Sequence, residues 1–285
     1  LFRGTGIVMN TSGMTWNNVQ PLGNTTLILS SDLNVGGNLS LPTQVTFTIN
    51  GFNVNLKGNL NLSNGSGTSG LVTGTTVIKF NGTSPQTWSS PITTNTVTNN
   101  LIFLNDVTVS GQVYFRSGTM TYTSGTIITT GSTLQLLGGA VTLNTAGITW
   151  NNVVCNGATT RTLSSTLTCN SLSIINGNNT FAGTGGFVTN SFSVAAGLTV
   201  TYVNGVTYTV NTSLTSSGTI GSQVNFTCAS GAALFNLTPG ATQNVTYTNA
   251  TRINSSGGQT IYTNAGTLTS TINWSVGGGN FFLLF

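Results

Sequence analysis

The sequence predicts an all-β fold, and within that class a parallel β-helix (β-solenoid) with coils of about 20 to 24 residues. Three observations predict it. Apolar residues alternate with Thr, Ser, Asn and Gly, turn residues interrupt the chain at short intervals, and one phrase of sequence recurs far along the chain. A solenoid accounts for all three, because each coil buries its apolar side against its neighbours.

The alternation defines the strands. In residues 45–49, 54–56 and 60–62, every second side chain is Val, Leu, Ile or Phe. A period of two residues is that of a half-buried β-strand, and no stretch shows the period of a helix. Clusters such as Gly138-Gly139 lie between the runs and predict turns.

The recurring phrase favours a repeat-built protein. The segment GMTWNNV at 13–19 returns as GITWNNV at 147–153, and a looser copy surrounds Trp88. The stretch between one copy of the phrase and the next has the length of about three coils of 20 to 24 residues. We therefore predict a single solenoid domain over residues 1–276, with internal modules near 13–84, 85–146 and 147–276, and a glycine hinge with an apolar tail over 277–285. An antiparallel β-sandwich or hairpin array is the alternative, because Asn50-Gly51 between alternating strands is a strong hairpin signal.

Two residue types mark the predicted repeat. The markers are Trp16, Trp88, Trp150, Trp274, Asp32 and Asp106. We interpret each Trp as packed at one corner of every third coil, and the alternative is a surface row of rings that stack on a ligand. The two Asp residues are predicted to occupy equivalent positions in consecutive modules.

Composition argues against several classes of partner. Charged residues make up 3% of the chain, against about 25% in an ordinary domain. A net charge of +4 arises from scattered basic residues: Arg3, Lys57, Lys79, Arg116, Arg161 and Arg252. Nucleic-acid binding needs a basic stripe that neutralises several phosphates, so no such partner is predicted. Hydroxyl and amide side chains must provide solubility, which suits an extracellular or virion surface.

Catalysis, cofactors and metals are not predicted. The chain has no His or Glu, so a Ser-His-Asp or Cys-His site cannot be assembled. Three coils at about 4.8 Å each would place Asp32 and Asp106 roughly 14 Å apart, too far for a glycosidase carboxylate pair at about 5 to 9.5 Å. Cys155, Cys169 and Cys228 form no CxxC pair, which argues against zinc. We interpret them as small buried residues.

The chain ends suggest assembly. No stretch approaches the roughly 18 apolar residues of a membrane span. The sequence begins at Leu1 without an initiator Met, so we expect it to start inside a longer or processed product. At the other end, an apolar tail is formed by Phe281, Phe282, Leu283, Leu284 and Phe285. An open last coil exposes backbone groups and core side chains, so we predict that this tail caps it, in the same subunit or in a neighbour of a homo-oligomer.

The repeated TWNNV phrase, the segment 238–247 (TPGATQNVTY), the Ser255-Ser256-Gly257-Gly258 turn and Asn273-Trp274 resemble β-helical appendage proteins. Such proteins include phage tail fibres and spikes and bacterial surface adhesins. The resemblance implies a fold and a surface location more than a ligand. Together with the composition, it leads us to predict a non-enzymatic structural and adhesive protein of a virion, which contacts a glycan or protein of a host-cell surface. A bacterial adhesin or matrix filament is the alternative. A polysaccharide-degrading tailspike and an ice-binding solenoid rank lower, the latter because Thr-x-Thr triplets such as 46–48 do not recur once per coil in the sequence.

Overall fold

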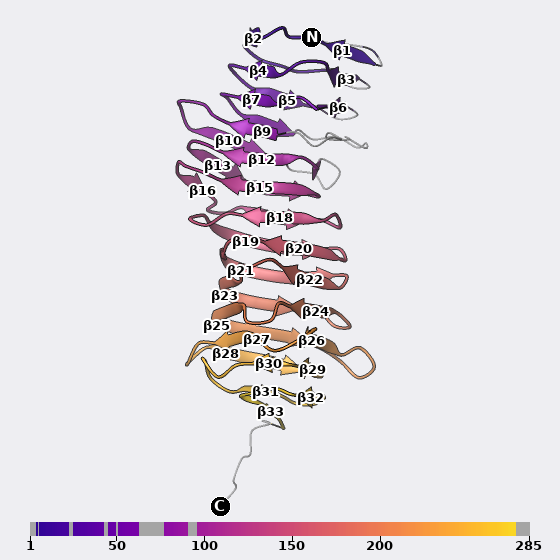
Figure 1. Cartoon of the computed structure of the whole chain (residues 1–285), viewed down its shortest axis with the longest axis vertical. Helices are drawn as coiled ribbons and strands as arrows, with labels where there is room; N and C mark the ends of the chain where they lie inside the picture. The colour runs from indigo at the N-terminus through magenta and orange to yellow at the C-terminus, as the bar shows by residue number, and fades with distance from the viewer. Residues whose placement is uncertain are drawn as a thin grey trace, which may run out of the picture. The chain divides into compact units, whose positions relative to one another are not determined.

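The computed structural model describes residues 4, 6–22, 25–42, 45–49, 51–62, 77–90 and 96–277. These residues form strands and turns without a helix, coiled as a parallel β-solenoid of about 11 turns (Figure 1). The sheets are parallel, as in the pairing of β1 with β3, of β21 with β23 and of β26 with β29. The predicted parallel β-helix is therefore confirmed, and the antiparallel sandwich or hairpin array is wrong. No helix among the described residues is long and apolar enough to cross a membrane.

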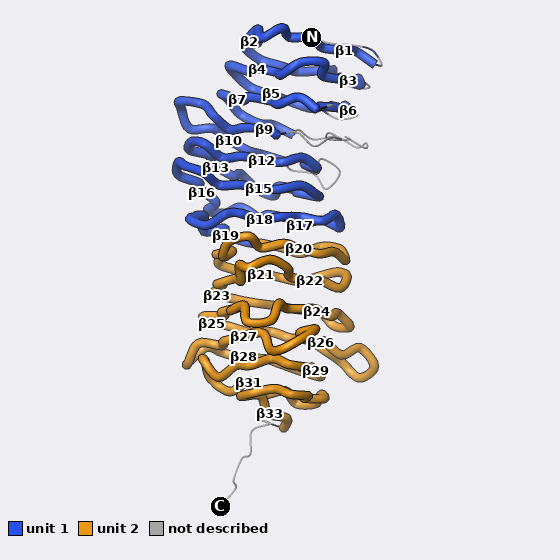
Figure 2. The backbone as a smooth tube through the Cα atoms, viewed as in Figure 1, with its two compact units in different colours: residues 1–152 blue, residues 153–285 orange. Residues whose placement is uncertain are grey.

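The chain divides into two compact units, unit 1 (residues 1–152) and unit 2 (residues 153–285) (Figure 2). The strands of unit 1 are β1 (Ile7–Met9), β2 (Thr15–Trp16), β3 (Thr26–Leu29), β4 (Leu33–Val35), β5 (Leu39–Leu41), β6 (Thr46–Thr48), β7 (Val54–Leu56), β8 (Leu60–Leu62), β9 (Val77–Phe80), β10 (Gln86–Ser89), β11 (Thr96–Val97), β12 (Asn100–Phe103), β13 (Val107–Ser110), β14 (Gln112–Phe115), β15 (Gly118–Tyr122), β16 (Ile127–Ile128), β17 (Thr133–Leu136) and β18 (Val141–Asn144). Strand β19 (Thr149–Asn156) contains the boundary between the units.

Unit 2 contains β20 (Thr159–Leu163), β21 (Leu167–Asn176), β22 (Asn179–Ala182), β23 (Phe187–Val194), β24 (Thr199–Tyr202), β25 (Thr207–Ser217), β26 (Val224–Cys228), β27 (Ala233–Leu237), β28 (Thr242–Thr246), β29 (Thr248–Thr251), β30 (Ile253–Asn254), β31 (Ile261–Thr263), β32 (Leu268–Thr269) and β33 (Trp274–Val276). Its coils use two kinds of strand. Short strands form the series β20-β22-β24-β26-β29-β32, and the longer β21, β23 and β25 stack beside β27 and β30. In the middle of β23 the burial alternation slips at Asn190-Ser191, where the register against β25 also shifts.

Coil length follows from hydrogen bonds between successive coils. Asp32 and Asn53, and likewise Asp106 and Thr126, are joined across 21 and 20 positions. Longer coils occur as well, such as the 28 positions between Asn59 and Thr87. The predicted length of about 20 to 24 residues therefore describes the shorter coils.

Asparagine ladders tie the coils of unit 1 at one corner. The side-chain oxygen of Asn18 accepts the Asn38 backbone N–H at 2.7 Å, and that of Asn38 accepts the Asn59 N–H at 2.9 Å. The oxygen of Asn59 accepts the Thr87 N–H at 2.7 Å. Beside this ladder a Cβ at Gly58 would overlap the carbonyl oxygen of Gly37, so the corner requires glycine. These uncharged contacts explain how a chain with so few charged residues holds its register.

Aromatic rings fill the core of unit 2. Phe187 lies among several of them, with ring centroids 5.0 Å from Phe192, 5.1 Å from Tyr208 and 5.6 Å from Phe181. Its own exposure is 0%. Because offset and edge-on ring pairs add to ordinary apolar burial, this cluster stabilises the stack of coils.

The strand pairing corrects the predicted repeat. The four tryptophans lie on strands of four different sheets, namely β2, β10, β19 and β33, so they do not mark one recurring corner. Trp88 and Trp150 are fully buried and Trp274 is 9% exposed, whereas Trp16 is half-buried. Likewise Asp32 precedes β4 and Asp106 precedes β13, which belong to different sheets, so their predicted equivalence is wrong. The sequence phrase recurs, but insertions between copies move it to another side of the coil.

Candidate functional site: a polar hollow between two strands

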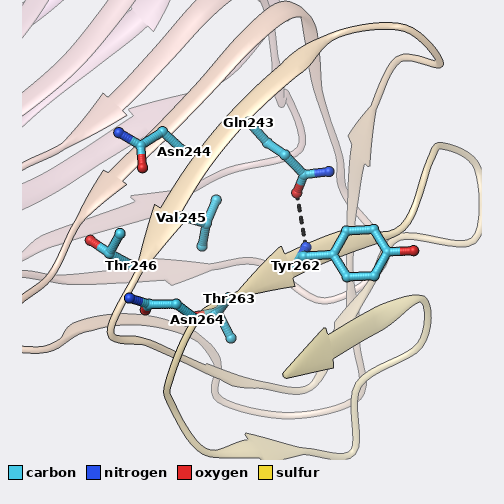
Figure 3. Close-up of a pocket in the computed structure, with 7 residues that line it drawn as sticks. All are labelled: Gln243, Asn244, Val245, Thr246, Tyr262, Thr263 and Asn264. Carbon is cyan, nitrogen blue, oxygen red and sulfur yellow. Dashed lines mark hydrogen bonds between the residues drawn. The ribbon is translucent and has the colours of Figure 1, made fainter. Parts of the chain in front are cut away.

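A break in the strand ladder near the C-terminal end of unit 2 creates a hollow. Strand β28 pairs with β25 and β31 pairs with β33, and no strand pairing joins β28 to β31 among the described residues. One backbone hydrogen bond, from the Asn264 N–H to the Val245 carbonyl at 3.3 Å, and the Gln243 side chain join them instead. The Gln243 Oε1 accepts the Tyr262 backbone N–H at 2.8 Å (Figure 3). Its Nε2 donates to the Thr260 carbonyl at 3.0 Å.

A hollow lies beside this bridge, where the strand ladder is interrupted. The hollow has a volume of about 240 Å3, and its lining comprises Gln243, Asn244, Val245, Thr246, Tyr262, Thr263 and Asn264. Val245 is buried and is the apolar residue among these side chains, while Tyr262 is 44% exposed. Tyr262 is also the single aromatic residue among the large hydrophobic side chains exposed in the described part of the chain. A ring at the edge of an open polar hollow is a surface on which a flat apolar face can stack.

Most polar groups of the lining have protein partners that fix them. The Asn264 Oδ1 accepts the Tyr247 N–H at 2.8 Å, and the Thr246 hydroxyl donates to the Gly218 carbonyl at 2.9 Å. In contrast, the Asn244 amide and the Tyr262 hydroxyl make no hydrogen bond to any described residue, and Asn244 is exposed. These two groups are available to a ligand. The amide offers two hydrogen-bond donors and an acceptor, and the hydroxyl can both donate and accept a hydrogen bond.

The hollow carries no formal charge, because its lining consists of amides, hydroxyls, one aliphatic side chain and one phenol. Recognition here would rest on hydrogen bonds and ring contact. Neutral polyhydroxylated molecules combine hydroxyl groups with apolar C–H faces, and they match this set of groups.

The two carboxylates predicted as markers have structural partners. Asp32 accepts the Asn53 backbone N–H at 2.8 Å, and Asp106 accepts the Thr126 N–H at 2.7 Å. Each therefore fixes the following coil. The described residues contain no group of three or more His, Cys, Asp or Glu that could hold a metal. The predicted capping residues 281–285 lie outside the described part of the chain.

The three cysteines are buried and free of disulfides. Burial raises the pKa of the Cys155 thiol, an effect that the nearby Arg161 guanidinium partly opposes. Burial also raises the pKa of Cys169 to about 12. A neutral buried thiol is a poor nucleophile, so Cys155 and Cys169 act as core side chains. The burial of all three cysteines agrees with the prediction from the sequence.

Sequence reasoning missed the hollow. One signal was present: within 261–263 the alternation turns Ile261 and Thr263 inward and Tyr262 outward. The interrupted ladder had no sequence signal, since it depends on which strand each segment meets one coil away. No known protein family, no curated protein and no solved structure matches the chain.

Proposed function

We propose that this protein is a non-enzymatic structural and adhesive component of a virion surface, such as a phage tail fibre or another appendage, and that it contacts a neutral glycan of a host-cell surface through the hollow at Tyr262. The observation that carries the proposal is that one hollow without formal charge is lined both by an exposed ring, Tyr262, and by the Asn244 amide, which makes no hydrogen bond to a described residue. A sugar ring presents a C–H face to the aromatic ring and hydroxyls to the amide.

The scaffold supports the same proposal. Its surface is rich in Thr, Ser and Asn and poor in charge, and side-chain ladders reinforce the backbone between coils. A stack of such coils is stiff and extends by adding units, as an appendage requires. Homo-oligomerisation and an extracellular or virion location belong to the proposal.

Binding to an array of neutral oligosaccharides tests the site. We expect the unchanged protein to retain a subset of glycans and Tyr262→Ala to bind them at least about tenfold more weakly, a loss of about 1.4 kcal/mol. The control is Ile272→Ala, which removes another exposed apolar side chain, 54% exposed, outside the hollow lining. Equal weakening by both variants would contradict the assignment of the site.

Electron microscopy of native particles labelled with antibody tests the location. Label on tails or capsids is the expected result. Label on bacterial cell walls or extracellular filaments would instead establish the adhesin or matrix alternative.

A further inference from the structure

A column of threonines runs across the short strands of unit 2. The register pairs Thr160 with Thr180, Thr180 with Thr201, Thr201 with Thr227, Thr227 with Thr251 and Thr251 with Thr269. One threonine therefore occupies the same place on β20, β22, β24, β26, β29 and β32. The sequence hid this regularity because the spacing along the chain varies from coil to coil.

The other outward side chains on these six strands are also small and uncharged. All outward positions on these six strands carry Thr, Asn or Ala: Thr160, Thr162, Thr180, Ala182, Thr199, Thr201, Asn225, Thr227, Asn249, Thr251 and Thr269. A second column places Thr199 beside Asn225 and Asn225 beside Asn249. We call this surface the threonine face. None of its outward strand residues is charged.

The hydroxyls of the column are free. None of the six takes part in a hydrogen bond with a described residue, and Thr160, Thr180 and Thr269 are exposed. On the long strands, by comparison, the Ser193 hydroxyl donates to the Ser173 hydroxyl at 2.8 Å. The threonine column therefore offers an array of donors and acceptors to the solvent.

The spacing of this array is fixed by the backbone. Neighbouring strands lie about 4.8 Å apart, and outward residues two positions apart along a strand are separated by roughly 6.6 Å. Each of the six strands, which form the rungs of the column, presents the methyl and the hydroxyl of one threonine. A discrete soluble ligand gains little from such repetition, whereas a crystal lattice gains the same contact at every rung.

We propose that the threonine face binds ice. Water in ice repeats at spacings close to those of strand rungs, so a hydroxyl on each rung can occupy a lattice position while the intervening methyls order water without binding it strongly. This face is independent of the hollow at Tyr262.

The corresponding column of unit 1 lacks this regularity. There the register places Asn55 beside Lys79, Lys79 beside Ile102 and Ile102 beside Thr121. A lysine and an isoleucine would interrupt any lattice match. The proposal therefore concerns unit 2 alone.

Ice-affinity partitioning tests the proposal, with the full chain at low concentration and a slowly growing ice surface. The unchanged protein is expected to enter the ice and to produce thermal hysteresis. Thr201→Tyr, in the middle of the column, is expected to lose both effects, because the ring would hold the lattice away from the neighbouring rungs. Thr201→Val, which keeps the methyl group and replaces the hydroxyl with a second methyl, is expected to retain part of the ice-bound fraction.

Thr209→Tyr is the matched control. Thr209 is half-buried and outward on β25, away from the threonine face, and it makes no hydrogen bond through its side chain to a described residue. It should partition like the unchanged protein, and circular dichroism should show the same β content for all variants. Exclusion of the unchanged protein from ice would overturn the proposal, as would equal behaviour of the two Tyr variants. Binding to crystalline cellulose or chitin together with exclusion from ice would identify a polymer surface instead, and would also overturn it.

Discussion

Replacing Gln243 tests whether one side chain holds the β28–β31 hollow open. Its two hydrogen bonds, at 2.8 and 3.0 Å, join the strands at Tyr262, where the strand ladder does not run between them. Further along, the Asn264 backbone N–H donates to the Val245 carbonyl at 3.3 Å. Each of the two Gln243 bonds is worth about 1 kcal/mol net. The Tyr262 N–H lies in an exposed setting, so water can replace the lost acceptor and the larger penalty of a buried unpaired group does not arise. Gln243→Leu should therefore reduce the local opening free energy by about 2 kcal/mol.

Hydrogen exchange followed by mass spectrometry measures this effect. A loss of about 2 kcal/mol corresponds to roughly 30-fold faster exchange in the segment 260–264. Gln243→Glu keeps the acceptor for the Tyr262 N–H but replaces the donor to Thr260 with a second acceptor, so its effect should be at least half as large in free energy. Gln223→Ala is the control, since the Gln223 side chain makes no hydrogen bond to a described residue. Unchanged exchange at Tyr262 in Gln243→Leu would refute the bridging role.

Three further predictions concern stability and reactivity. Phe187→Ala should lower the free energy of unfolding by about 3 to 5 kcal/mol in denaturant titrations, because the ring is fully buried among other rings; a loss below about 1 kcal/mol would show that the cluster relaxes freely. The Asp32→Asn, Asp106→Asn double variant should keep its stability within about 1 kcal/mol and retain glycan binding, because the remaining amide oxygens still accept the same N–H groups; lost binding would place a carboxylate in the site. The free energy of unfolding should fall as pH rises from about 9 toward 12, because burial raises the pKa of Cys169 to about 12 in the folded protein and the thiol therefore ionises first in the unfolded chain. Cys169→Ala should weaken this pH dependence. The same pH dependence in Cys169→Ala and in the unchanged protein would contradict the prediction.

The sequence alone determined the fold class and the inward-facing residues. Alternation of period two can be satisfied only by strands. Because the residues that alternate with the apolar ones are polar but rarely charged, hydroxyls and amides cover the surface. The buried positions in 45–49, 54–56 and 60–62 follow from that rule. The lack of His and Glu, which removes whole classes of catalytic site, is likewise a property of composition.

Only the tertiary structure decided which residues share a face. In a solenoid, a residue meets the one a full coil away, and variable turn lengths make that partner unpredictable from sequence spacing. Similar phrases around Trp16 and Trp150 therefore reached different sheets, while Thr201 and Thr227, in dissimilar segments, became neighbours. The hollow at Tyr262 has the same origin: it exists because β28 and β31 do not pair, and Gln243 spans the gap that they leave.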